Sequence, residues 1–514
     1  MASHQPLNSN RAQLRQGLRG YQIFFIVISS VIGTGVFTSN GQALALAGPL
    51  GMLFTVIILG LIAIFVGETI SELVQVFPVP NAIFEYVYAF VDEDLAWVVG
   101  VCYWYSFASV FALQMLGAAA LLSYWGPDGF LAPLVFYGVT PFVLFFLNLS
   151  GVYWFGIVET IGGFLKIILL FGVTFILYVI AGGQGDPNEP IKNGFNHNID
   201  FINNNTKAIC LAFPAVAYSY IGIEATIVAA FEAQPPNGIG WPSRTIHWAV
   251  FLLYFLCTLG IALTVQWGNP SLPVPYGGIV LHSNSTGNQA GKTDSAVIIA
   301  VLQSDRGVVA GIINGCLIFS TISAANTSLY IASRTLYGLT YRITGRNPLS
   351  RKLRKASVIW EVTGTPAMAL LWSVLAFYWL PWLEMVTNKS AAILINDVID
   401  MISITSSVSC LIVWAAICVA FHRYERWTRL CDDGLRTRGY TRFIRNSPEY
   451  KQRVWNLLIW LQPWNARIGF IGCLVAFAFA SAMWWDTPVT PLKVAAAYGT
   501  VGPAHLSRNS LDKD

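Results

Sequence analysis

Charged residues are scarce in this sequence. Asp, Glu, Lys and Arg together make up only 11% of its 514 residues, whereas 55% are apolar. A chain with so little charge is not an ordinary soluble protein. The composition predicts an all-α polytopic membrane protein with one helical domain, which has the lipid bilayer as its surroundings.

Patterns of catalytic residues are also missing. The sequence has no metal-ligand spacing, no serine or cysteine nucleophile paired with a histidine, and no phosphate-binding loop. The eight cysteines fall in expected spans or in a basic loop, so we expect no disulfide. We therefore predict that the protein is not an enzyme and uses no metal and no cofactor.

The few charges are unevenly distributed along the chain. Six Lys and Arg residues lie between positions 342 and 355, and nine lie between positions 423 and 453. Both clusters separate apolar runs, where the positive-inside rule explains them more simply than nucleic-acid binding does. We expect both loops to be cytoplasmic and no nucleic acid to be a partner. The N-terminus, with Arg11, Arg15 and Arg19, is expected on the same side, with the first span as an uncleaved anchor.

Eleven apolar runs are long enough to cross a bilayer. They cover residues 22–47, 51–75, 95–124, 131–149, 153–182, 207–233, 246–268, 307–341, 365–387, 394–421 and 467–485. Two shorter pieces are expected to be helical without spanning. Residues 84–90 predict a helix at the membrane interface, and residues 295–302 belong to an external segment that could form a lid.

The first apolar run contains an interruption. Residues 29–37 read Ser-Ser-Val-Ile-Gly-Thr-Gly-Val-Phe, with two glycines and a threonine at mid-depth. These residues form helix poorly, and unwound backbone in hydrocarbon is tolerated only where it is buried in protein or lines a cavity. N–H groups at the start of the second half-helix favour a carboxylate, and carbonyls at the end of the first favour an ammonium. The alternative is a close helix crossing through small residues.

A second interruption lies in the sixth run, five helices later. Residues 217–224 read Ala-Tyr-Ser-Tyr-Ile-Gly-Ile-Glu and place a glycine, a serine and a carboxylate at mid-depth. Paired breaks at matching positions of two five-helix halves are typical of an inverted-repeat transporter with its site at the bilayer midplane. We predict repeat one over residues 21–182, repeat two over 207–421 and a peripheral helix over 467–485. This transmembrane domain of residues 21–485 is flanked by tails of residues 1–20 and 486–514.

Several short motifs occur together in one order along the chain. They are Ile-Gly-Thr-Gly-Val-Phe at 32–37, Gly-Pro-Leu-Gly at 48–51, Gly-Glu at 67–68, Phe-Val-Asp at 90–92, Tyr-Trp-Tyr at 103–105, Ser-Ala-Ala-Asn-Thr-Ser-Leu-Tyr at 323–330, Ser-Arg-Thr-Leu-Tyr at 333–337 and Trp-Ala-Ala-Ile-Cys at 414–418. As a set they resemble the amino-acid permeases of the amino acid-polyamine-organocation superfamily, closest to the fungal branch. The resemblance implies ten core helices in two inverted halves, alternating access, and uptake of an amino acid with protons across the plasma membrane.

The resemblance also implies which residues bind the substrate. Its carboxylate would lie against the backbone donors of the first break, and its ammonium against carbonyls flanking both breaks. The matching positions in the first break are Ile32, Gly33, Thr34 and Gly35, and those in the second break are Tyr218, Ser219, Tyr220, Ile221 and Gly222. Tyr218 matches an aromatic residue that closes over the substrate in relatives. The alternative for Tyr218 and Tyr220 is packing in the core.

Coupling to protons needs a titratable group, and charged residues inside spans are functional candidates by default. Lys166 lies deep in the fifth run, at the position where proton-coupled relatives carry a lysine. Its alternatives are a structural ion pair or a side chain that reaches the interface. Glu224 is the second candidate, either as a proton site or as a hinge residue bonded to unwound backbone. Glu68 and Glu232 lie nearer the helix ends and are interpreted as structural.

Among the departures of the sequence from the family, two concern the substrate and the C-terminus. Many fungal members have a glutamate in the third span where this chain has Gln114, which argues against arginine or lysine as the substrate. The usual twelfth helix is missing, because residues 486–514 contain an apolar run only at 492–498. We interpret this as a truncated or alternatively spliced C-terminal tail.

Two alternative functions stay open. One is a nutrient receptor that binds amino acids without transporting them, although the segment before Tyr21 is short for a signalling extension. The other is a permease of the same family for a polyamine, choline or 4-aminobutyrate. The sequence specifies neither the substrate's side chain nor an oligomeric state.

Overall fold

A computed structural model describes most of the chain. The described residues are 17–126, 133–183, 194–195, 204–234, 239–269, 271–273, 295–345, 347–385, 389–445 and 447–484. The predicted tail of residues 486–514 and most of the segment 270–294 lie outside these ranges. Within them the chain is helical, and pairing outside helices is limited to two isolated bridges.

Within the described residues, helices lie at all eleven apolar runs that the sequence predicts to span the membrane. Eight helical stretches are long and apolar enough to cross a bilayer, and the first of them, Gly20–Val76, contains two spans. A kink at Gly48 separates these two spans, because its φ of 72° breaks the helix just before Pro49. Two shorter apolar helices, Leu134–Leu149 and Ala367–Leu383, complete the set.

The first repeat contains spans one to five. They are formed by α1 (Gly20–Val31), η1 (Gly35–Ser39) and α2 (Asn40–Val76), then α4 (Glu93–Leu122) with η2 (Ser123–Trp125), η3 (Leu134–Val139) with α6 (Thr140–Leu149), and α7 (Val152–Gly183). The predicted interfacial helix is α3 (Ala82–Phe90). It starts after Asn81, whose φ of 51° lies in the left-handed region that asparagine tolerates.

The second repeat contains spans six to ten. They are formed by α8 (Asn205–Tyr220) with η4 (Ile223–Ala225), α9 (Thr226–Ala229) and η5 (Ala230–Glu232), then α10 (Gly240–Thr264), α13 (Gly307–Arg342), α15 (Ala367–Phe377) with α16 (Trp379–Leu383), and α17 (Lys389–Leu430). The short predicted piece before span eight is α12 (Ala296–Gln303).

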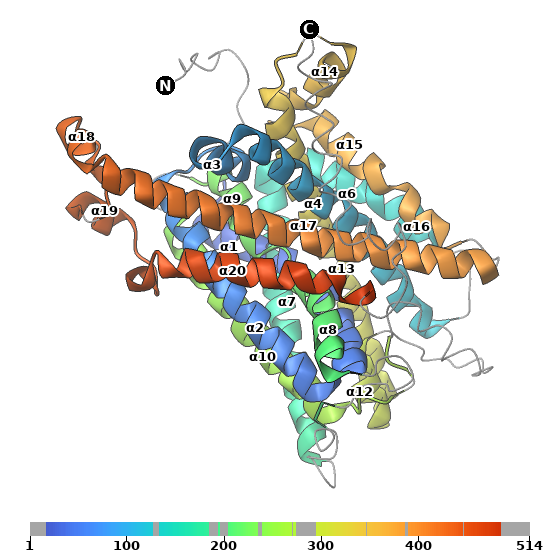
Figure 1. Ribbon diagram of the computed structural model, residues 1–514. Coiled ribbons are helices and arrows are strands. Elements are labelled where there is room, and N and C mark those ends of the chain that lie inside the picture. The colour runs from blue at the N-terminus through green and yellow to red at the C-terminus, as the bar shows by residue number, and fades with distance from the viewer. Residues whose placement is uncertain are drawn as a thin grey trace.

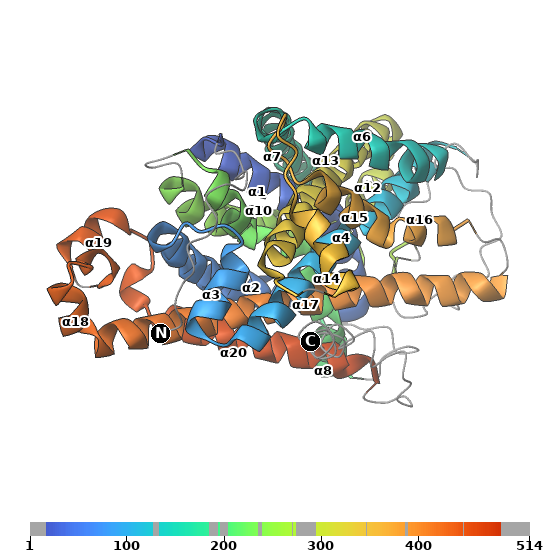
Figure 2. The same ribbon diagram turned by 90° about the horizontal axis from the view of Figure 1, so that it is seen from above.

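Connecting helices and one peripheral span complete the chain. They are α14 (Pro348–Leu353), η6 (Arg354–Ser357), α18 (Asp432–Thr437), η7 (Thr441–Phe443), α19 (Pro448–Arg453), η8 (Ile459–Leu461), α20 (Trp464–Phe479) and η9 (Ala480–Trp484). The peripheral span α20 runs beside α17 along one side of the molecule in both views (Figures 1 and 2). In the interior, α4 packs along α13, and α2 packs against α8 and α10.

Both predicted breaks are confirmed. Span one stops at Val31, because Ile32 has the extended angles φ −80° and ψ 93°, and it resumes at Gly35 in a wide π turn. Span six stops at Tyr220, and Gly222 has a φ of 112°, in the region that favours glycine. Neither span is therefore wound continuously through its break.

The outer face of α7 shows how the chain meets lipid. Its large apolar side chains at 164, 168, 171 and 175 are each more than half exposed, and they follow one helical stripe. The opposite face buries the polar side chains of Glu159 and Lys166. This arrangement is the reverse of a soluble helix and suits a helix with lipid on one side and protein on the other.

The two basic loops lie at the same end of the molecule, beside α3. Arg342, at the end of α13, pairs with Glu85 of α3, and Arg423 of α17 donates to the Val91 carbonyl that follows α3, at 2.9 Å. We call this the basic end. Here the chain before span one also meets the end of span six, because Gly17 and Leu18 each donate a backbone hydrogen bond of 2.9 Å to the Glu232 carbonyl.

Candidate functional site

A cavity lies between the two helix breaks. It is lined by Ser30, Val31 and Gly35 of span one, Tyr218 and Ile221 of span six, Phe107, Val110 and Gln114 of α4, and Ser328 of α13. The space is tight. About 250 Å³ is empty, but a water-sized sphere can be centred in only about 10 Å³ of it, which is roughly the room for one water.

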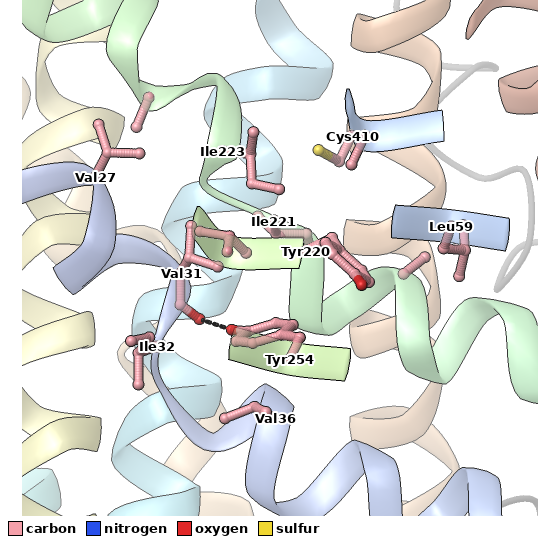
Figure 3. Close-up of a cluster of buried hydrophobic side chains, with 14 of the residues drawn as sticks. Val27, Val31, Ile32, Val36, Leu59, Tyr220, Ile221, Ile223, Tyr254 and Cys410 are labelled. Carbon is pink, nitrogen blue, oxygen red and sulfur yellow. Dashed lines mark hydrogen bonds between the residues drawn. The ribbon is translucent and has the colours of Figure 1, made fainter. Parts of the chain in front are cut away.

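Spans one and six approach each other very closely at this cavity. A Cβ on Gly35 would lie 2.7 Å from the Ser219 Cα atom, so no larger residue fits without moving backbone. Figure 3 shows span one unwinding beside Ile221 and Tyr254. The first break thus both opens the helix and allows a close approach to the second break.

Carbonyl groups freed by the first break are partly hydrogen-bonded. The Tyr254 hydroxyl donates to the Val31 carbonyl at 2.7 Å (Figure 3), and the Ser320 hydroxyl donates to the Ile32 carbonyl at 3.1 Å. Each carbonyl oxygen can accept a second hydrogen bond. The predicted ammonium acceptor Ile32 is therefore held in place and still has capacity for a ligand.

Gln114 covers the predicted carboxylate donors of the first break. Its Oε1 accepts from the Thr34 backbone N–H at 3.2 Å and from the Thr34 hydroxyl at 3.0 Å. A Cβ on Gly33 would lie only 2.6 Å from Gln114 Nε2. The side-chain oxygen of Gln114 thus occupies a position that a substrate carboxylate would need.

Sequence reasoning identified Gln114 only as a departure from the family and missed its place in the site. The spacing of Phe107, Val110 and Gln114 could have indicated it, because residues at these intervals lie on one face of a helix, here α4. Ser328, on α13, had no comparable signal.

Three buried hydroxyls at the breaks have no hydrogen-bond partner among the described residues. They are Ser30 Oγ, Tyr218 OH and Ser219 Oγ. A buried polar group without a partner costs about 1–3 kcal/mol, so such groups are normally satisfied by a ligand or water. Their position around the cavity indicates that a polar ligand completes this site.

The two predicted tyrosines have different surroundings. Tyr218 lines the cavity. Tyr220 is turned toward α2, where its hydroxyl donates to the Val56 carbonyl at 3.1 Å, and Figure 3 shows its hydroxyl end on the Leu59 side. Tyr220 therefore packs in the core, whereas Tyr218 is available to a ligand.

Comparison with known proteins identifies the family. The profile described as amino acid permease matches residues 22–440. The chain belongs to the amino acid permease family. It is similar to the probable amino-acid permease meu22 of Schizosaccharomyces pombe, 24% identical over 82% of this permease and 69% of that protein. It is also similar to the S-adenosylmethionine permease GAP4 of Candida albicans, 28% identical over 81% of this permease and 64% of that protein.

These relatives confirm the resemblance to the fungal branch, and this permease spans roughly two thirds of their lengths. Among solved structures, a manganese transporter of Eremococcus coleocola is similar. Its TM-score is 0.57 at 13% identity, and the match covers 96% of this permease and 93% of that chain. The likeness shows the shared transporter fold, with the inverted five-plus-five repeat that the paired breaks predict.

Lys166 of this permease connects span five to the first break. Its side chain is fully buried, and Nζ donates to the Ser29 carbonyl at 2.7 Å, in the last turn of α1. A cation at a helix C-terminus interacts favourably with the helix dipole. The Ser29 hydroxyl is hydrogen-bonded to Ser323 of α13 at 2.7 Å, and the Ser323 hydroxyl lies 3.3 Å from Glu159 Oε2. The amine thus belongs to a polar network that joins spans one, five and eight.

Glu224 holds the second break. Both of its carboxylate oxygens accept from the Gly222 N–H at 3.3 Å, and one accepts from Trp414 Nε1 at 3.0 Å. The carboxylate is fully buried. This is the geometry expected of a hinge residue bonded to unwound backbone, and it leaves the role of a proton site open.

Glu232 lies at the basic end. From the sequence it is interpreted as a structural residue because it is close to a helix end. Its carboxylate accepts from the Tyr330 hydroxyl at 2.6 Å and from Arg334 Nε at 3.2 Å, and all three side chains are buried. The guanidinium of Arg334 also stacks 4.3 Å from the centre of the Tyr330 ring. This cluster ties the end of span six to span eight.

Proposed function

We propose that this permease is a secondary active transporter that imports an amino acid across the plasma membrane by proton symport with alternating access. The basic end and the N-terminus would be cytoplasmic, as the positive-inside rule suggests. The observation that carries the proposal is the cavity between two broken helices, where backbone dipoles and unpartnered hydroxyls surround a space. Such a surface suits a small zwitterion, since it offers both donors and acceptors without a net charge.

The binding steps follow from the groups at the breaks. The substrate carboxylate would replace the Gln114 oxygen on the Thr34 N–H, and further donors would come from Gly33 and Gly35. The ammonium would lie against carbonyls near Ile32 and in the turn of residues 218–221. Because the cavity holds about one water, Gln114 must move and the spans must separate before an amino acid enters.

Proton coupling is assigned to Lys166 in this proposal. Among the described residues, its amine donates one hydrogen bond, to the Ser29 carbonyl of α1. This first half of span one must move in alternating access. Loss of the proton from the amine would remove a charge-assisted hydrogen bond and release α1. Glu224 would act as the hinge of span six and is a second candidate for the proton.

Uptake assays test this proposal. The purified permease is reconstituted in proteoliposomes and supplied with labelled alanine, glutamate, lysine, phenylalanine or S-adenosylmethionine, with and without an inward proton gradient. We expect accumulation of at least one amino acid that a protonophore abolishes. Binding without accumulation would instead favour the receptor, and accumulation that ignores the protonophore would refute proton symport.

A further inference from the structure

A second cavity lies beyond the breaks, at the basic end. It is lined by Asn81 and its neighbours before α3, Tyr103 of α4, Val228 and Phe231 at the end of span six, and Arg334 and Thr335 of α13. About 390 Å³ is empty, open space at the mouth included, but a water-sized sphere can be centred in only about 20 Å³ of it, compared with about 10 Å³ between the breaks. As at the breaks, the walls must separate before a solute enters. Nothing in the binding steps described above uses it.

The two cavities share two walls. On α4, Tyr103 of the second cavity and Phe107, Val110 and Gln114 of the first follow one helical stripe. On α13, Ser328 lines the first cavity and Thr335 lines the second, two turns further toward the basic end. With a rise of about 1.5 Å per residue, the cavities are on the order of 10–16 Å apart along these helices. A solute leaving the breaks along these walls reaches the second cavity next.

Between the cavities stands one aromatic pair. Tyr103 and Phe107 contact each other edge to face, with ring centres 4.9 Å apart. Both side chains are buried. Rotation of these rings would connect the two spaces without disturbing the helices that carry them.

The second cavity is surrounded by hydrogen-bond donors that lack acceptors. The buried hydroxyl of Tyr103 and the Nδ2 group of Asn81 have no hydrogen-bond partner among the described residues. The Tyr103 hydroxyl also faces the Glu224 carboxylate, so a ligand in this cavity would share the hydroxyl with Glu224. Asn81 is fixed by close packing, since a Cβ on Gly338 would lie 2.5 Å from its Cβ. Such donors are normally satisfied by an acceptor from a ligand or by water.

Arg334 supplies the charge of this cavity. It is the one charged side chain of the lining. Its Nε donates to Glu232 and its Nη1 to Ser333. An arginine beside two uncharged donors matches a carboxylate, which accepts on both oxygens.

We propose that this cavity is a second binding site for the substrate carboxylate, occupied while the substrate leaves toward the basic end. The inference rests on the proposed transport function. Tyr103, Asn81 and Arg334 would hold the carboxylate, and Arg334 would shift from Glu232 toward it. That shift weakens the Glu232 cluster, so that arrival of the substrate helps to open the basic end.

Sided transport kinetics test the proposal. Proteoliposomes with one orientation of the permease are used to measure the apparent KM of the transported amino acid from each face, for wild type, Tyr103→Phe and Asn81→Gly. Glycine keeps the left-handed backbone at 81 and removes only the amide side chain. We expect each variant to raise the KM at the basic face about tenfold, the effect of one hydrogen bond to a charged group, and to leave the KM at the opposite face unchanged.

The matched control is Tyr86→Phe. Tyr86 is buried in α3 and donates to the Phe77 carbonyl at 2.6 Å, so its hydroxyl has a structural partner and lines neither cavity. This variant should lower the melting temperature without changing either KM. Equal KM changes at both faces, or none at the basic face, would overturn the second site alone. A wild type that transports no amino acid would overturn the proposed function as well.

The lipid composition separates a substrate from a lipid headgroup. The same measurements are made in phosphatidylcholine vesicles with and without phosphatidylglycerol. If the two variants raise the KM at the basic face equally in both kinds of vesicle, the result supports the substrate carboxylate as the occupant. An effect that occurs only with phosphatidylglycerol would mean that an anionic headgroup occupies the cavity, and would overturn the proposal.

Discussion

The substitution Gly35→Ala tests the contact between the two broken helices. The new Cβ would lie 2.7 Å from the Ser219 Cα atom, so the backbones must separate by roughly 0.7 Å to reach ordinary contact at 3.4 Å. Overpacking of this kind costs about 1–3 kcal/mol of folding free energy. The effect on transport should be larger, since a displacement of about 1 Å at a reacting or binding centre reduces rates about 100-fold.

The matched control is Gly172→Ala, in α7. A Cβ at this position has no atom within 4 Å, and it faces the lipid side of the helix. Both variants are reconstituted at equal protein amounts, and initial uptake of the transported amino acid is compared with melting in detergent. We expect Gly35→Ala to lose about 99% of uptake while still folding, and Gly172→Ala to behave as wild type. Normal uptake by Gly35→Ala, or equal loss in both, would refute the assigned contact.

Three further predictions follow from side-chain contacts. Lys166→Met should make uptake independent of the pH gradient, measured as equal rates with and without protonophore; an unchanged pH dependence would contradict its coupling role. Gln114→Glu places a negative charge beside Thr34, where the substrate carboxylate would bind, and should raise the KM for alanine at least tenfold; an unchanged KM would show that position 114 does not face the substrate. Burial and the neighbouring Glu72 raise the pKa of Tyr450, at the basic end, well above 10.0. Its hydroxyl, which donates to Glu72, stays protonated in the folded and the unfolded chain below that pH. Tyr450→Phe should therefore cost about 1.5–3 kcal/mol of stability, measured by thermal or chemical unfolding at about pH 8, and no measurable cost would count against this hydrogen bond.

The broken spans could be predicted because their signal is local. Two glycines and a threonine interrupt an apolar run at residues 33–35, and unwound backbone inside lipid has few uses. The same holds for the span count, which depends on run length alone. The kink at Gly48 is likewise a local signal, since proline follows it directly.

The composition of the cavity could not be predicted in the same way, because it depends on how each helix is rotated. Tyr218 and Tyr220 are two residues apart, so they point in nearly opposite directions on a helix. Helical spacing alone does not say which of them faces the site, although the resemblance to the family favoured Tyr218. The fold turns Tyr218 to the cavity and Tyr220 to α2. Gln114 and Ser29 show the same limit, since their partners lie 80 and 137 residues away along the chain.

The join between the chain before span one and the end of span six is made by main-chain atoms. Gly17 and Leu18 donate to the Glu232 carbonyl, and Gln234 donates to the Leu18 carbonyl at 2.8 Å. Exchange of any of these side chains leaves the three bonds intact, whereas proline at position 18 would delete one of them. At this one junction the two inverted halves are therefore joined through peptide groups.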